Sequence, residues 1–269
     1  MPALRSPLSP RAAPALRVRT VGLGQPFQWL GRGWADLWRC PAPGLIHGLL
    51  AALFGLGLVG WVREYFWVMA GAFSGFLIVA PIVATGLYAV SRALERGQPT
   101  SMREVFNLWR GHDPRLVHFG VLLGLAGTGW VITSASMITS FSDLPVRRPL
   151  DFLHFVVLQD SGWLFEAWLL LGALLAAPMF ASSVVAMPLL LDRKVDVLTA
   201  VLTSWRVVLA SPGPMALWAG LIMGISMLGM VTLLLGLVVA VPWLAHASWH
   251  AYRDLVEPAE EPAGAAGSA

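Results

Sequence analysis

Histidines in apolar surroundings are the first residues of this 269-residue chain whose types and spacing could do chemistry. His246 and His250 are four residues apart and share one face of a helix, a spacing that suits two ligands of a metal ion or haem. His47 and His118 stand early in two other apolar runs, so all four imidazoles could meet at one membrane face. Two imidazoles alone do not complete a site. The alternative is a set of interfacial histidines that bond backbone carbonyls or lipid phosphates and hold no cofactor.

Glu166 is a carboxylate inside a long apolar run, and such a residue is by default a candidate for proton or cation binding. It follows Trp163 by only three residues. Snorkelling to the outer interface, or pairing with Arg63, Arg147 or Arg148, is therefore the expected alternative.

Ser182 and Ser183 could line a polar cavity, or could bond the backbone carbonyl four residues earlier in a helix. The chain has no GxSxG elbow, no Walker A loop, no GxGxxG behind a strand and no EF-hand loop. The sequence therefore predicts that the protein is not an enzyme.

Long apolar runs must position these groups. Hydrophobic residues make up 57% of the chain and charged residues 12%. The runs are roughly 44–62, 65–90, 116–141, 163–191 and 214–250. Each is long enough to cross a bilayer, which takes about 20 helical residues, and backbone pairing in lipid requires a helix. The last run would extend about 55 Å as one helix. We expect a hairpin that turns near Met227–Thr232, with one bent span as the open alternative.

Three similar units organise these runs, so the expected fold is an all-α polytopic membrane protein with six transmembrane helices. Each unit has an amphipathic helix, a proline-containing break and a helical hairpin. The amphipathic helices end in Trp-Arg pairs, expected to be interfacial anchors: Trp38-Arg39, Trp109-Arg110 and Trp205-Arg206. Packing of these helices on one another outside the membrane is the alternative. The hairpins are expected to kink at Pro81, Pro188 and Pro242.

Local spacing supports the amphipathic helices and close helix packing. Met102, Phe106 and Trp109 share one helix face behind a Ser101-x-x-Glu104 capping box. In the first unit the expected apolar face is Phe27, Leu30, Trp34, Leu37 and Trp38. The first span of each unit opens with a pair of glycines four residues apart: Gly44/Gly48, Gly120/Gly124 and Gly220/Gly224. Such pairs let helices approach closely, and we favour packing within the chain over a dimer interface.

Charge sets the expected domains and orientation. Residues 1–22 are a basic tail and 257–269 an acidic tail, both expected to be disordered, and 23–256 form the six-helix membrane domain. Fifteen of the eighteen Lys and Arg residues fall on one side of the six spans, which predicts that both termini are cytoplasmic. Arginines beside the spans favour anionic lipid head groups, and not nucleic acid, as the partner. A single cysteine, Cys40, excludes an intramolecular disulfide.

Four stretches of the last third resemble a known family: 187–193, 203–206, 211–218 and 246–255. The family is the one catalogued as domain of unknown function twenty-one eighty-nine, predicted integral membrane proteins of proteobacteria. The resemblance covers roughly residues 20–256. It implies a bacterial inner-membrane location, a six-span fold and no established activity.

Three functions follow from these observations. The leading hypothesis is a non-enzymatic scaffold, assembly factor or lipid- and partner-interacting protein of the bacterial inner membrane. The alternative is a small-solute or ion transporter or channel built from three parallel repeats, with Glu166 or Ser182 meeting the substrate. The third is a haem or metal redox component that uses His246 and His250.

Overall fold

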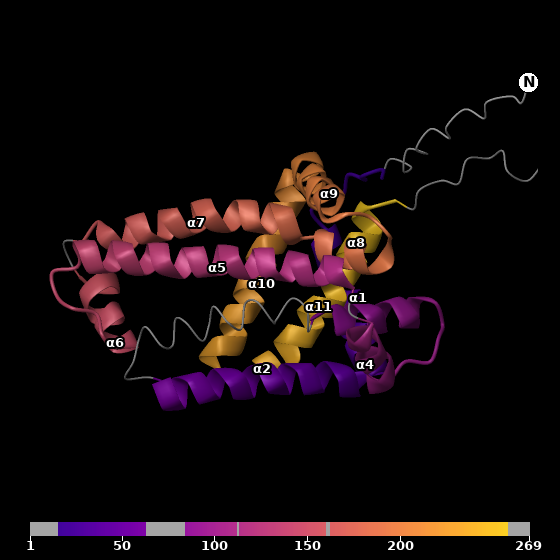
Figure 1. Ribbon diagram of the computed structural model, residues 1–269, viewed down its shortest axis with the longest axis horizontal. Helices are drawn as coiled ribbons and strands as arrows, with labels where there is room; N and C mark the ends of the chain where they lie inside the picture. Colours follow the sequence, from indigo (N-terminus) through magenta and orange to yellow (C-terminus); the bar gives the residue numbers. More distant parts are fainter. Residues whose placement is uncertain (1–15, 63–83, 112, 160–161, 258–269) are drawn as a thin grey trace, which may run out of the picture.

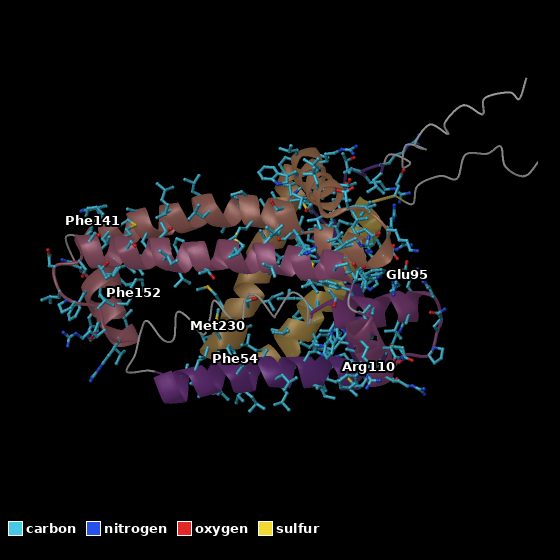
Figure 2. The ribbon with its side chains drawn as sticks, in the orientation of Figure 1. Phe54, Glu95, Arg110, Phe141, Phe152 and Met230 are labelled. Atoms are coloured by element: carbon cyan, nitrogen blue, oxygen red, sulfur yellow. The ribbon has the colours of Figure 1, made fainter. Side chains whose placement is uncertain are left out.

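The computed structural model describes residues 16–62, 84–111, 113–159 and 162–257, and most of these residues are helical (Figure 1; side chains are drawn in Figure 2). Residues 84–95 are helical, and η1 (Leu153–Val157) is a single π-helical turn. The α-helices are α1 (Gln25–Arg39), α2 (Pro41–Val62), α4 (Met102–Arg110), α5 (Pro114–Phe141), α6 (Pro149–Phe152), α7 (Leu164–Ser183), α8 (Ala186–Asp192), α9 (Val197–Ala210), α10 (Pro212–Val231) and α11 (Leu237–Leu255). The all-α class is confirmed.

Four helical segments in the described part of the chain are long and apolar enough to cross a membrane: Pro41–Gly60, Pro114–Phe141, Leu164–Asp192 and Pro212–Val231. Most of the expected second span, 65–90, lies outside the described residues. Helix α11, the expected sixth span, is not among the four, since its second half carries histidines and charged residues. The polytopic helical class is therefore confirmed, whereas six spans in three repeats stay a prediction.

The last apolar run forms two helices, α10 and α11, so the alternative of one bent helix is wrong. The turn occupies residues 232–236, slightly later than expected, with Leu233 and Leu234 at positive φ (54° and 67°). The Thr232 hydroxyl oxygen accepts the Gly236 amide at 3.0 Å. A Cβ at Gly236 would lie 2.8 Å from the Gly229 Cα, so the closing contact requires glycine.

Proline placement agrees with the expected kinks where the structure describes it. The helix breaks between α7 and α8, and Pro188 stands in the first turn of α8. Pro242 lies inside α11 and, lacking an N–H, cannot bond the carbonyl of Val238. A Cβ on Gly48 of α2 would clash with that carbonyl oxygen, so glycine permits the contact. The Gly44/Gly48 pair therefore packs within the chain, as expected. Pro81 lies outside the described residues.

The apolar face expected for α1 divides into two. Leu30 and Leu37 are buried against the rest of the molecule, whereas Phe27, Trp34 and Trp38 are exposed by 56%, 42% and 51%. Helix α11 packs along a neighbouring stripe of α1, which also buries Trp29. A Cβ on Gly33 would lie 2.5 Å from the Ala247 amide nitrogen, so this close approach requires glycine. The expectation of one uniform face is wrong because α1 is held from one side only.

The ends of the described chain lie side by side. Val18 and Val256 form an antiparallel bridge, and the Arg19 amide donates to the Leu255 carbonyl at 2.9 Å. Leu16 is buried in the core cluster that also contains Trp218 and Trp249. Residues 16–21, assigned to a disordered tail from the sequence, are thus folded against the end of α11, because Leu16 and Val18 can bury apolar surface there.

Candidate functional site

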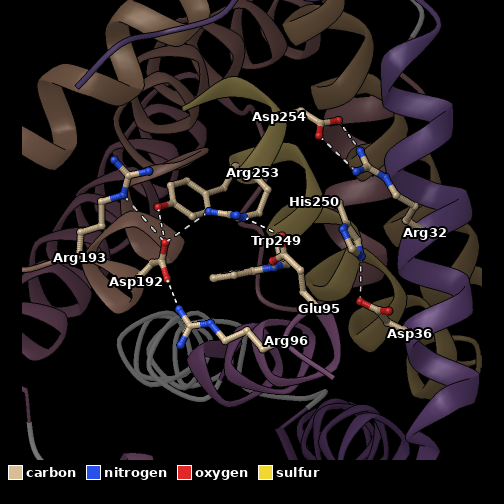
Figure 3. A network of polar contacts seen from close by, with 11 residues as sticks. Arg32, Asp36, Glu95, Arg96, Asp192, Arg193, Trp249, His250, Arg253 and Asp254 are labelled. Atoms are coloured by element: carbon tan, nitrogen blue, oxygen red, sulfur yellow. Dashed lines mark hydrogen bonds and ion pairs between the residues drawn. The ribbon is translucent and has the colours of Figure 1, made fainter. Parts of the chain in front are cut away.

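A network of polar side chains lies at one end of the helices, where α1, the helix over residues 84–95, α8 and α11 meet (Figure 3). We call it the polar network. Its members come from segments far apart in the sequence: Arg32, Asp36, Ser91, Glu95, Arg96, Asp192, Arg193, His246, Trp249, His250, Tyr252, Arg253 and Asp254.

Asp36 of α1 is the most buried carboxylate of the network, at 3% exposure. It accepts hydrogen bonds from the Ser91 hydroxyl and from Nε2 of His250, both at 2.8 Å. Burial alone would raise the pKa of Asp36, but the bonds from His250 and Ser91 and the charge of His250 bring the pKa below its usual value. Asp36 therefore carries a negative charge at neutral pH.

Ser91 connects Asp36 to His246. The Ser91 hydroxyl oxygen lies 2.8 Å from Nδ1 of His246 and gives its own proton to Asp36, so Nδ1 must be the donor to Ser91. A nucleophilic triad needs the reverse order, in which the serine gives its proton to the imidazole. The arrangement therefore orients an imidazole and does not activate the serine.

Asp254 holds α1 to α11. Its carboxylate accepts hydrogen bonds from the Gln25 side chain at 2.6 Å and from the Trp29 indole at 2.8 Å. The guanidinium of Arg32 binds both carboxylate oxygens in the fork geometry that makes Arg–carboxylate pairs specific. All these donors belong to α1, so one acidic residue fixes the position of that helix.

Asp192 and Glu95 accept the remaining donors of α11. The Tyr252 hydroxyl donates to Asp192 at 2.8 Å. Nε of Arg253 lies 3.0 Å from Glu95, and the Trp249 indole donates to Glu95 at 3.0 Å. Asp192 also lies within 3.4–3.9 Å of guanidinium nitrogens of Arg96, Arg253 and Arg193.

Two arginines bind the carbonyl end of α8. Arg115 donates to the carbonyls of Leu190, Arg193 and Val195, and Arg92 donates to that of Leu191. The last carbonyls of a helix lack partners within it and carry partial negative charge, so guanidinium groups stabilise them. Arg115 also binds the carboxylate of Asp113, and this bond lowers the pKa of Asp113.

A cavity of about 460 Å³ opens beside the network. Its charged lining balances three guanidinium groups against three carboxylates, and the lining residues are Arg32, Ala35, Asp36, Arg39, Glu95, His250, Arg253 and Asp254. They include no serine, cysteine or threonine. Since Asp36, Glu95 and Asp254 already bind donors of the network, the arrangement braces helices and offers no free nucleophile.

The four candidate histidines do not form one site. His246 and His250 lie together as expected and His47 is near enough to act electrostatically on His246, but His118 is exposed on α5. Nδ1 of His246 and Nε2 of His250 bond different partners. No group of three or more His, Cys, Asp or Glu residues within the described ranges could hold a metal ion. The four-histidine cluster that the sequence left possible is therefore not formed, because His118 faces outward.

Glu166 lies exposed in the first turn of α7. A carboxylate there interacts favourably with the positive end of the helix. The backbone amides of Arg147 and Arg148 bond Asp151, at 2.9 and 2.8 Å. Arg63 lies outside the described residues.

The two serines of α7 differ. The Ser183 hydroxyl donates to the Met179 carbonyl four residues earlier, at 2.8 Å. The Ser182 hydroxyl accepts the Trp205 indole of α9 at 2.9 Å. Ser182 therefore joins α7 to an amphipathic helix.

The three Trp-Arg pairs end α1 and α4 and lie in the third turn of α9. Trp38, Arg39, Arg110 and Arg206 are exposed, and Trp205 is 37% exposed. Trp109 is half-buried, with its ring centroid 5.5 Å from that of His47.

Sequence reasoning missed the acids that hold the network. Asp192 and Asp254 stand in ordinary charged flanks of apolar runs, and nothing in the sequence singled out Asp36. A usable signal was the spacing of His246, His250 and Asp254, which repeat every four residues on one face of α11.

These features define a polytopic α-helical membrane protein whose helices are joined by a polar network at one end. The model of the family described as predicted integral membrane protein (DUF2189) matches residues 68–192. The similarity to this family expected from the sequence is therefore confirmed over that segment, which contains residues 187–192 but none of the other three stretches that carried the resemblance. The matched segment includes Ser91, Glu95 and Asp192 of the network and ends at Asp192. No curated protein and no solved structure matches the chain.

Proposed function

We propose that the protein is a non-enzymatic scaffold of the bacterial inner membrane. Its amphipathic helices engage anionic lipid head groups and present a surface to membrane-protein partners. The polar network sets the position of α1 on the spans, and both termini are cytoplasmic.

The observation that carries the proposal is an exposed apolar stripe on α9. Leu198, Leu202, Trp205 and Leu209 are 66%, 54%, 37% and 72% exposed. Their spacing of four, three and four residues places them on one face. The opposite face is buried through Ala200, Thr203, Ser204 and Val207. A helix with one face on the protein and an apolar second face outside suits the membrane–water interface.

Helix α1 supports the same placement. Three exposed residues of α1 are Phe27, Trp34 and Trp38. They have the same spacing along the helix, seven and then four residues, as Leu198, Trp205 and Leu209 of α9. Tryptophan is enriched at head-group depth. Arg39 and Arg206 stand next to these stripes and supply positive charge towards anionic lipids.

The contact of Val18 with Val256 supports the orientation, because two adjacent chain ends require an even number of crossings. The excess of basic residues beside these ends favours the cytoplasm.

The transporter alternative needs polar groups along the spans. Glu166 is at a helix end and Ser182 is bonded to Trp205, so neither faces a described polar path. The redox alternative needs imidazole nitrogens that can bind a metal or haem. Nδ1 of His246 and Nε2 of His250 bond Ser91 and Asp36, which leaves Nε2 of His246, buried without a hydrogen-bond partner, as the candidate ligand atom. Within the described residues no third His, Cys, Asp or Glu completes a metal site with the two histidines.

Spin labels at single cysteines in vesicles test the proposal, in a Cys40→Ala background because Cys40 is the sole cysteine. A label at Leu202 should collide with lipid-soluble oxygen more than with an aqueous nickel chelate. A label at Lys194, in the exposed loop before α9, is the matched control and should show the reverse. Equal nickel access at both positions would refute interfacial placement. Solute flux that Glu166→Gln or Ser182→Ala abolishes would instead establish the transporter.

A further inference from the structure

A groove lined mainly by apolar side chains runs between α5 and α7, which lie side by side along their length (Figure 1). Its volume is about 570 Å³, within the range of about 300–1,000 Å³ usual for small-molecule sites. Phe119, Leu123 and Trp130 line it from α5, and Leu175 and Met179 line it from α7. We call it the α5/α7 groove.

Both walls of the groove belong to candidate membrane spans, Pro114–Phe141 and Leu164–Asp192. On the placement proposed above, the medium at its mouth is therefore lipid. The lining on α5 extends from Phe119 to Thr133, which is about 21 Å of helix. One leaflet of the hydrocarbon core is about 15 Å deep. The groove is thus longer than one leaflet is deep, so it can hold one acyl chain along its length.

The groove is open at Gly129, which is exposed. Gly129 lines it, and a Cβ added at Gly129 would meet nothing within 4 Å. At the end away from α9, the ring of Trp130 packs on α7, where a Cβ at Gly172 would lie 3.2 Å from that ring. A flexible polymethylene chain suits such an open groove lined by apolar side chains.

One end of the groove meets α9, which Figure 1 shows nearly along its axis, across the direction of α5 and α7. Ser182 and Val201 line this end, and the Trp205 indole donates to Ser182 at 2.9 Å. Arg206 follows Trp205 and is exposed. Because the only N–H donor of the Trp205 indole is bonded to Ser182, the guanidinium group of Arg206 is the donor beside it that suits a phosphate at head-group depth.

Lipid chains are as apolar as leucine, so moving a chain from bulk lipid into the groove gains little hydrophobic energy. The groove must therefore select a bound lipid by how its acyl chain packs and by how its head group binds. We propose that the α5/α7 groove holds one acyl chain of an anionic phospholipid whose phosphate binds beside Arg206 and Trp205. This inference rests on the proposed function for the bilayer placement of α5, α7 and α9.

Native mass spectrometry of the full chain tests the inference after reconstitution with phosphatidylglycerol or phosphatidylcholine and extraction in mild detergent. Wild type should retain one phosphatidylglycerol. Gly129→Leu places a side chain in the groove and should lower retention about tenfold, the change expected when roughly ten atom–atom dispersion contacts with the acyl chain are lost. Gly57→Leu is the matched control, since Gly57 lies exposed in the span of α2 with nothing within 4 Å. It should behave as wild type.

Arg206→Gln should reduce retention of phosphatidylglycerol to that of phosphatidylcholine. Equal retention by Gly129→Leu and Gly57→Leu would overturn the groove assignment, and a doubled mass that Gly129→Leu abolishes would assign the groove to a second copy of the chain.

If Gly129→Leu lowers the unfolding temperature, Ala126→Phe, which fills the same groove from an exposed position, replaces it. If the spin label at Leu202 lies at the interface but Gly129→Leu retains phosphatidylglycerol as well as wild type does, this inference is refuted and the proposed function still stands.

Discussion

Replacing Asp36 by asparagine probes the centre of the polar network. The substitution keeps the shape of the side chain and one oxygen that can accept from Ser91 and His250. It removes the negative charge, so two charge-assisted hydrogen bonds become neutral ones.

The structure sets the size of the effect. A hydrogen bond to a charged group contributes about 1.5–3 kcal/mol and a neutral one about 0.5–1.5 kcal/mol. Two weakened bonds at a side chain only 5% exposed should therefore lower the free energy of unfolding by about 2–3 kcal/mol. At about 2–4 °C per kcal/mol for chains of this size, the melting temperature should fall by roughly 5–10 °C.

Thermal unfolding in detergent, followed by circular dichroism, measures this loss. Glu166→Gln is the control, because an exposed acid should change stability by less than about 0.5 kcal/mol. The pKa of Asp36 is lowered in the fold, so its contribution is present above the ordinary aspartate pKa of about 3.9 and is lost as pH falls through the lower folded value. The difference between wild type and Asp36→Asn should hold from pH 8 to about pH 5 and shrink below about pH 4. Equal melting temperatures for Asp36→Asn and Glu166→Gln at pH 7 would refute the network as a brace.

Two further substitutions test how the helices are joined. Gly48→Ala should lower the free energy of unfolding by about 1–3 kcal/mol, because the added methyl group clashes with the Val238 carbonyl. Gly57→Ala is the control and should not lower it, because a Cβ there meets open space. Thermal melts of the two variants in parallel measure the difference, and equal melting temperatures would contradict the prediction. Arg115→Gln removes the donors that hold the end of α8, so tryptic cleavage after Lys194 should become at least several-fold faster; an unchanged cleavage rate would show that these bonds do not hold the loop.

Apolar run length and local spacing predicted the helices well. The Ser101 capping box of α4 is present as expected, and the last apolar run turns because 55 Å of helix exceeds the bilayer. These are local properties, since a cap or a span depends on residues near one another in the chain.

The polar network could not be predicted, because it depends on which helices pack together. Asp36 and His250 are 214 residues apart, and nothing in either neighbourhood indicates that they meet. The same cause divided the apolar face of α1. Its spacing predicted Leu30 and Trp34 on one face, but only docking of α11 at Gly33 decides that Leu30 is buried and Trp34 exposed.

The most direct test of the central claim is the membrane depth of α1 with and without its anchor. When Asp254 is intact, a spin label at Phe27, on the exposed stripe, should lie at head-group depth and give a spectrum with a single component of restricted motion. Asp254→Asn weakens the bonds to three α1 side chains, so the label should become mobile and spread over a range of depths. A label that shows the same depth and mobility in both proteins, or that is fully aqueous in both, would contradict an interfacial helix held by the polar network.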